Sequence, residues 1–324
     1  MTSDQSADRG GGPAGRPGGR WLAGVIPPVC TPLGPDGDVD AASLERHVNF
    51  LLEAGVHGLF MLGSSSEVAF LTDAQRDRVL EIAVKTTAGQ VPVLAGAIDM
   101  TTSRVVDHAL RAKQRGVDGI VITVPFYART AHRAEVGLHF RTVRHRVGLP
   151  LIAYDIPVSV HTKLDTALAL ELASEGVIDA IKDSSNDMHG FRALVTGTRR
   201  FKTFSVFTGS ELVVDCALFL GAEGAVPGLS NVDPHGFVAL YNSSRSGDWD
   251  AAREIQDKLV RLFDITNRAD PSMKGPSSSG LGGFKTALML LGVFAGNTMG
   301  LPQIALDSEE TAAVKAVLVR EGLL

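Results

Sequence analysis

Short apolar segments alternate with longer amphipathic segments from Trp21 onward, at intervals of roughly 25 to 40 residues. An apolar segment of about five residues is typical of a strand, and the longer segments carry the helical period. The predicted strands lie at 22–26, 58–62, 91–97, 119–124, 151–154, 203–207 and 224–228, and the sixth in chain order carries Lys182. Helices are predicted at 41–54, 72–87, 101–116, 132–147, 164–174, 188–196, 212–220 and 233–243.

The predicted strands are nearly continuous apolar runs, as in parallel strands that are buried on both faces. Eight βα units are the number that closes a (β/α)8 TIM barrel. The competing architecture, an open doubly wound sheet, needs a G-x-G-x-x-G fingerprint after the first strand, and none follows 22–26. Asp40 and Thr72 stand where their side chains can cap two of the predicted helices. The sequence therefore predicts an α/β barrel.

The remaining segments flank this barrel. Residues 1–20 are rich in Gly, Asp, Ser and Arg and lack the apolar region of a signal peptide, so we expect a disordered tail. The barrel is predicted over 21–246 and a C-terminal helical region over 247–324. Its helices, about three, are expected at 249–267, 283–294 and 308–321, with a Ser/Gly-rich loop at 276–283.

Composition excludes several classes of partner. The chain is 44% hydrophobic and 21% charged, with a net charge of -5 and no basic run, so no nucleic-acid surface is expected. No apolar run reaches the ~18 residues that span a bilayer. Cys30 and Cys216 form no C-x-x-C pair, which argues against a disulfide framework or a cysteine zinc site and fits a cytoplasmic protein.

In a barrel of this kind the active site lies at the C-terminal ends of the strands. The candidate site residues at these ends are Ser64, Ser65 and Glu67 (second strand), Tyr127 (fourth), Tyr154 (fifth), Lys182 (sixth), Ser210 and Glu211 (seventh), and Val226 (eighth). Successive backbone N–H groups after the second strand can form a nest for a carboxylate. The alternative for that turn is an ordinary polar loop.

Lys182 ends an apolar, β-branched run, which is an unusual place for a lysine. Burial favours the neutral form of an amine, and a neutral amine attacks ketones to give a Schiff base. Tyr127 and Tyr154 would supply acid/base groups for such chemistry. The alternatives are that Lys182 reaches water and pairs with Asp183, and that the buried phenols only bind backbone.

Two other catalytic classes find no support. The turn Gly63-Ser64-Ser65-Ser66-Glu67 lacks the second glycine of the serine-hydrolase motif G-x-S-x-G. Histidines 132, 139 and 145 lack the spacing of a shared ligand face, and no H-E-x-x-H occurs. We therefore expect no metal and no cofactor other than the covalent imine.

Four segments together resemble the dihydrodipicolinate synthase / N-acetylneuraminate lyase family. Gly63-Ser64-Ser65-Ser66-Glu67 resembles its G-T-T-G-E turn, and Pro125-Phe126-Tyr127 its P-Y-Y. Tyr154-Asp155-Ile156-Pro157 resembles its Y-N-x-P, and Ile181-Lys182-Asp183 its G-x-K-[DE]. The resemblance runs in order from about Val25 to the C-terminus. It implies a metal-free class I aldolase or lyase acting on pyruvate or a 2-oxo acid.

The resemblance also implies a role for each matching residue. Lys182 would form the imine, and Tyr154 would shuttle the proton on the substrate oxygen. Ser64 would link Tyr154 to Tyr127 in a relay, with Tyr127 reaching across a dimer interface in a dimer of dimers. Backbone N–H groups of Ser64 and Ser65 would hold the carboxylate. Val226 would line the substrate site.

Three departures from the family pattern direct the choice of substrate. Ser66 replaces a glycine, and Asp155 replaces an asparagine. Ser159 stands where dihydrodipicolinate synthases carry an arginine for the second substrate's carboxylate, which argues against aspartate semialdehyde. We therefore favour cleavage of a 2-keto-3-deoxy sugar acid, with Ser210 and Glu211 contacting its hydroxyls. The alternatives are the synthase, a dehydratase that uses the same imine, and a non-catalytic ligand-binding barrel.

Overall fold

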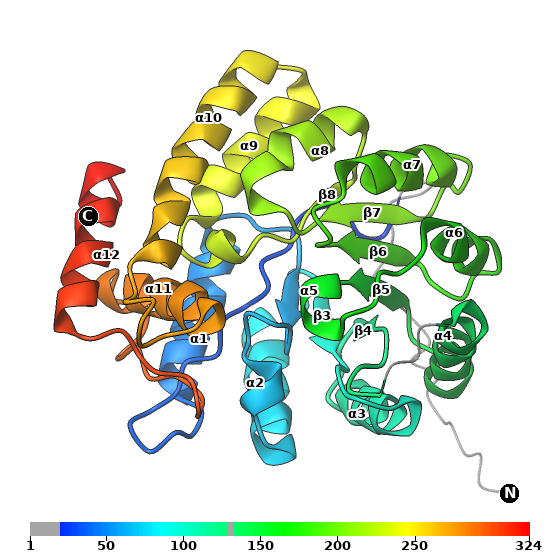
Figure 1. Ribbon diagram of the computed structural model, residues 1–324, viewed down its shortest axis with the longest axis horizontal. Coiled ribbons are helices and arrows are strands. Elements are labelled where there is room, and N and C mark those ends of the chain that lie inside the picture. The colour runs from blue at the N-terminus through cyan, green and yellow to red at the C-terminus, as the bar shows by residue number, and fades with distance from the viewer. Residues whose placement is uncertain (1–19, 129–131) are drawn as a thin grey trace, which may run out of the picture.

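The structure is a computed structural model of the chain that describes residues 20–128 and 132–324. The tail predicted at 1–20 lies outside the described residues except for Arg20. Eight parallel strands run in the order β1-β8-β7-β6-β5-β4-β3-β2, and helices surround them (Figure 1). The strands are β1 (Gly24–Val25), β2 (Leu59–Met61), β3 (Val93–Gly96), β4 (Gly119–Thr123), β5 (Leu151–Asp155), β6 (Ala180–Asp183), β7 (Ser205–Thr208) and β8 (Gly224–Ala225).

The ring closes between the two ends of this order, β1 and β2. Pro28, just after β1, forms an isolated parallel bridge with Phe60 of β2. The Phe60 amide donates to the carbonyl of Pro27 at 2.9 Å, and the Val29 amide donates to the carbonyl of Phe60 at 2.9 Å. The predicted barrel is thereby confirmed.

The helices that follow the strands cover the outside of this barrel. They are α1 (Ala41–Glu53), α2 (Asp73–Thr87), α3 (Thr102–Gln114), α4 (Arg133–Val147), α6 (Thr166–Ser174), α7 (Met188–Thr198), α8 (Val214–Leu220) and α9 (Pro234–Ser246). The two predicted caps are confirmed, because Asp40 accepts from the Ser43 amide and Thr72 forms a capping box with Gln75. None of the helices in the described ranges is long and apolar enough to cross a membrane.

Every strand residue is buried, as nearly continuous apolar strands require. The barrel interior includes Leu22, Ile26, Phe60 and Phe207, each at most 1% exposed. Each such side chain contributes roughly 1.5–3 kcal/mol by leaving water. The interior is therefore a packed core, and in barrels of this kind the active site lies at the C-terminal ends of the strands.

The strand predicted at 224–228 is too long. β8 ends at Ala225, and Pro227, which has no amide to donate, leads into the 3-10 turn η3 (Gly228–Asn231). After β5, the short helix α5 (Pro157–Val160) was not predicted. Pro157 begins α5 and fits there, since the first helical residue has no intrahelical amide bond to lose.

The C-terminal region packs against the β8 side of the barrel and α1 (Figure 1). Its elements are α10 (Trp249–Leu262), η4 (Phe263–Asn267), α11 (Pro276–Leu290) and α12 (Ser308–Arg320). The loop expected at 276–283 is wrong, because these residues form the first turns of α11. Gly282 and Gly283 serve close packing there: a Cβ on Gly283 would lie 2.4 Å from the Ile265 carbonyl oxygen.

Candidate active site

Lys182 and Tyr154 face each other at the rim of the barrel interior. They are register partners on β6 and β5, and their side chains are 5% and 3% exposed. The Lys182 Nζ lies 4.1 Å from the centre of the Tyr154 ring and 5.3 Å from the centre of the Phe60 ring. The two aromatic rings thus form part of the wall around the amine. The structure therefore brings together the predicted amine and phenol.

Ser64 adjoins this pair. Its Oγ lies 3.5 Å from the Tyr154 hydroxyl, at the outer limit of a hydrogen bond. Val226 and Lys182 line the interior of the barrel together with Phe207. Tyr154 on β5, Ser64 after β2 and Val226 after β8 thus lie at the same end of the barrel as Lys182.

The turn after β2 is held by its own hydrogen bonds. The Ser66 amide donates to the Gly63 carbonyl at 3.1 Å, and the Glu67 amide donates to the Ser64 carbonyl at 3.0 Å. The Ser66 hydroxyl is fully buried and donates to the Val29 carbonyl at 2.5 Å. The serine at this departure from the family pattern therefore anchors the turn to the loop after β1.

Asp155, the second departure, belongs to a buried charge cluster. Asp155 and Asp183 are register partners at the ends of β5 and β6, 1% and 4% exposed. Burial raises the pKa of the Asp155 carboxyl. Lys163 forms ion pairs with both carboxylates, at 3.5 Å to Asp183, and the Leu164 amide donates to Asp155 at 2.9 Å. Sequence reasoning missed Lys163; the unusual Asp155 beside Asp183 is the signal that a cation is needed.

Glu211 and Ser210 follow β7, and their side chains bind different partners: Glu211 the Leu229 amide, and Ser210 the Asn186 side chain. Burial raises the pKa of the half-buried Glu211 carboxyl to about 7, even though it accepts from the Leu229 amide at 2.6 Å. Glu211 can therefore donate or accept a proton near neutral pH. The Ser210 hydroxyl donates to the Asn186 Oδ1 at 2.7 Å.

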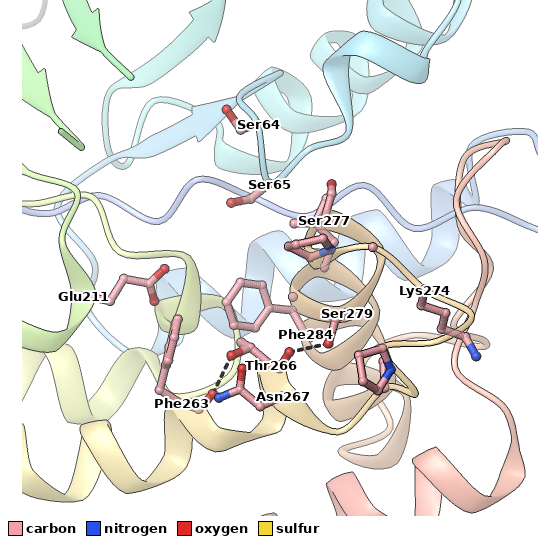
Figure 2. A pocket seen from close by; sticks show the side chains of 16 residues that line it. Ser64, Ser65, Glu211, Phe263, Thr266, Asn267, Lys274, Ser277, Ser279 and Phe284 are labelled. Carbon is pink, nitrogen blue, oxygen red and sulfur yellow. Dashed lines mark hydrogen bonds between the residues drawn. The ribbon is translucent and has the colours of Figure 1, made fainter. Parts of the chain in front are cut away.

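A cavity of about 770 Å³ separates the β2 turn from the C-terminal helices. Ser64, Ser65 and Glu211 form its barrel side, and Phe263 and Phe284 form part of the opposite wall (Figure 2). Lys274 also lines the cavity, and its Nζ lies 2.8 Å from a carboxylate oxygen of Glu310. The cavity thus offers hydroxyl groups and one acid to a ligand.

Tyr127 lies apart from these residues. Its side chain is 91% exposed and its φ is 74°, in the loop after β4. Within the described part of one chain, Tyr127 makes no hydrogen bond to Ser64. A single chain therefore does not assemble the relay that the resemblance implies.

The histidines and acidic side chains do not gather into a metal site within the described ranges. Across residues 20–128 and 132–324, no group of three or more His, Cys, Asp or Glu side chains is placed to hold a metal ion. Of the histidines on α4, His139 is buried, and burial lowers its pKa to about 4. Its ring accordingly belongs to the packing beneath α4.

Known proteins are similar to this chain along nearly its whole length. Residues 21–321 match the model of the dihydrodipicolinate synthetase family. An uncharacterized DapA-like lyase of Halobacterium salinarum is 34% identical over 303 residues, covering 94% of this chain and 95% of that protein. A probable 2-dehydro-3-deoxy-D-pentonate aldolase of Escherichia coli is 30% identical, covering 94% and 98%.

Solved structures agree. The structure of YagE, a dihydrodipicolinic acid synthase family protein of Escherichia coli in complex with pyruvate, superposes with a TM-score of 0.86 and 28% identity, covering 94% of this chain and 99% of that one. The dihydrodipicolinate synthase of Bacteroides thetaiotaomicron gives a TM-score of 0.87 and 28% identity, covering 92% and 98%.

Proposed function

This chain belongs to the dihydrodipicolinate synthetase family, and from this premise we propose that it is a class I aldolase whose reaction passes through an imine between Lys182 and a 2-oxo acid. The observation that carries the proposal is the pairing of Lys182 with Tyr154 at the rim of the barrel, 4.1 Å from Nζ to ring centre. An amine and a phenol this close provide both the nucleophile and the proton carrier that imine chemistry needs.

The steps in the cleavage direction follow from these groups. The neutral Lys182 amine attacks the C2 ketone, and the carbinolamine loses water to give the imine. Loss of the C4 hydroxyl proton then breaks the C3–C4 bond, which releases an aldehyde and leaves an enamine on Lys182. Protonation at C3 and hydrolysis release pyruvate and free the lysine. Tyr154 carries the protons at the substrate oxygen, and Ser64 Oγ, 3.5 Å away, passes them on.

The carboxylate of the 2-oxo acid requires a binding site of its own. We assign it to the backbone N–H groups of Ser64 and Ser65, since a turn with successive free amides binds anions. The amides of Ser66 and Glu67 are already used within the turn. The two free amides and the Ser64 hydroxyl thus fix the substrate's end next to Tyr154.

The substrate that fits best is a 2-keto-3-deoxy sugar acid. Ser159 is exposed on α5 and supplies no cation for a second carboxylate. The cavity beside the turn offers hydroxyl groups and Glu211, which suit the hydroxyls of a sugar chain. A relative named as a probable 2-dehydro-3-deoxy-D-pentonate aldolase supports this choice. We assign Ser210 to the same contacts.

The relay requires a second copy of this chain. Tyr127 is exposed and makes no hydrogen bond to Ser64 within the described part of its own chain, so we assign it to the site of a partner in a dimer, and the assembly to a dimer of dimers. The reaction is assigned to the cytoplasm, without a metal or other cofactor.

Trapping tests the proposal directly. The protein is incubated with pyruvate and borohydride, and its intact mass is measured beside that of Lys182→Ala. A stable pyruvyl adduct in the wild type only is expected. Absence of an adduct in the wild type would exclude the imine. Assays with 2-keto-3-deoxy acids, and with pyruvate plus aspartate semialdehyde, then separate aldolase from synthase. Loss of water without carbon–carbon cleavage would indicate a dehydratase, and an adduct without any turnover would indicate a binding protein.

A further inference from the structure

A buried ion pair joins the β2 turn to the C-terminal helix α11. The Glu67 Oε2 lies 2.5 Å from the Lys285 Nζ, although the two residues are 218 positions apart in the sequence. Glu67 is 1% exposed and Lys285 is fully buried. The other carboxylate oxygen accepts from the Gly300 amide at 2.7 Å. Both oxygens of Glu67 are therefore committed to the C-terminal region.

Glu67 is also the last residue of the turn that adjoins the catalytic pair. Its amide donates to the carbonyl of Ser64 at 3.0 Å, and its φ is 57°. Leu62, at the other end of the turn, has a φ of 56°. Left-handed backbone at residues other than glycine is unfavourable and persists only where the surroundings enforce it. The Ser64 and Ser65 amides are thus presented by a turn that needs external support.

The support comes from the C-terminal side. Lys285 lies on α11 next to Phe284, which lines the cavity beside the turn. A buried ion pair adds little net stability, because desolvation offsets the attraction, so its presence here points to a role in fixing geometry. The absence of a side chain at Gly300 permits this close approach to Glu67. A Cβ there would lie 2.9 Å from the Phe70 Cβ and 3.3 Å from the Glu67 Oε1.

We infer that Lys285 is a positioning residue: through Glu67 it holds the turn in the conformation that presents the Ser64 and Ser65 amides to the substrate carboxylate. The C-terminal helical region is thereby part of the carboxylate site, although none of its residues needs to touch the reacting atoms. The inference rests on the proposed function of the same site. Unlike loss of the imine lysine, loss of this support should weaken the binding only of substrates that carry the carboxylate.

The test removes both charges together, because removal of one leaves the other buried without a counter-ion. The variant is Glu67→Gln with Lys285→Met, which keeps the side-chain volumes. Borohydride trapping at Lys182 is measured against the concentration of pyruvate and, separately, of hydroxyacetone, a ketone without a carboxylate. We expect the half-saturating pyruvate concentration to rise by roughly tenfold or more, with hydroxyacetone trapping unchanged.

A second double change, at a partly exposed ion pair, controls for the loss of an ion pair elsewhere in the barrel. Arg144 lies 2.7 Å from Asp179 at the opposite end of β6, where Asp179 also accepts from the Leu151 amide. The double change Arg144→Met with Asp179→Asn should leave pyruvate trapping as in the wild type. An equal effect in this control, or unchanged half-saturation in a folded Glu67/Lys285 variant, would overturn the inference.

A second variant covers the case in which the neutral pair does not fold. Glu67→Asp keeps the charge and the ion pair's neutrality but withdraws the carboxylate by one methylene, so it cannot reach both Lys285 and Gly300 in the present geometry. The same rise for pyruvate alone is expected, and no change would contradict the inference.

If even the wild type gives no pyruvyl adduct, the proposed function fails. If the wild type gives one and the variants match it, only the role of Lys285 fails.

Discussion

Tyr154 and Lys182 are register partners on adjacent parallel strands, and the lysine Nζ lies over the tyrosine ring at 4.1 Å. This contact separates two properties of the tyrosine, because the ring contacts the Lys182 amine while the hydroxyl lies beside Ser64. The ring can therefore be kept while the proton carrier is removed.

Tyr154→Phe makes that change. We expect turnover to fall roughly 10²–10⁴-fold, the usual contribution of a positioned acid/base group. The melting temperature should hardly move, since the hydroxyl's only contact in the described chain is the 3.5 Å approach to Ser64. Steady-state kinetics and thermal unfolding check the two halves separately. Retention of full turnover would remove Tyr154 from the mechanism.

Two changes in the cluster of Asp155, Asp183 and Lys163 should differ in their cost to stability. Asp155→Asn leaves one cation with one carboxylate, Lys163 with Asp183, and should alter the free energy of unfolding by no more than about 1 kcal/mol. Lys163→Met leaves two buried carboxylates without a cation and should cost about 2 to 3 kcal/mol. Denaturant titrations of both variants provide the comparison. Equal effects would show that Lys163 does not compensate the pair.

Glu211 should make stability depend on pH. Burial raises its pKa in the fold to about 7, from an ordinary value of 4.5. The folded state therefore holds the proton more tightly between these values, and stability falls as the pH rises through this window. Glu211→Gln has no such titration. It should be more stable than the wild type at pH 8, by up to about 3 kcal/mol, and the difference should vanish towards pH 4.5. Melting temperatures across this range test it.

His47 and His139 should give a pH dependence of stability opposite to that of Glu211. Burial lowers the pKa of each ring to about 4, from an ordinary value of 6.5. The unfolded chain takes up protons between pH 6.5 and 4 that the fold does not, so stability falls as the pH drops. Each ring should contribute a loss of up to about 3 kcal/mol at pH 4. Because Glu211 titrates in an overlapping window, the measurement belongs in the Glu211→Gln background. There, His47→Leu should flatten the acid limb of the melting-temperature profile.

The barrel and its central pair could be predicted because both follow from local pattern. Buried parallel strands are apolar throughout, and their C-terminal ends meet at one rim, so Lys182 and Tyr154 had to be neighbours. The start of α11 could not be predicted, since its glycines resemble a loop and only the packing against Ile265 explains them. The ion pair of Glu67 with Lys285 was equally hidden, because nothing local indicates that two charges this far apart in sequence will be buried together.

Tyr127 poses a question that only a mixture of chains can answer. If its hydroxyl serves the site of a second copy, then Tyr127→Phe and Lys182→Ala each inactivate a homodimer in a different way. A mixed dimer would contain one complete site, made of Lys182 from the first variant and Tyr127 from the second. Random mixing should then restore about a quarter of the wild-type sites.

The experiment mixes the two purified variants after reversible dissociation and follows turnover with time. Recovery of activity above the sum of the separate variants is expected. The control mixes Tyr154→Phe with Lys182→Ala: these residues are register partners in the same site of one chain, so no mixed dimer can contain a complete site. Failure of the Tyr127 mixture to exceed this control, with dimer exchange confirmed by native mass, would place the role of Tyr127 within its own chain or outside the reaction.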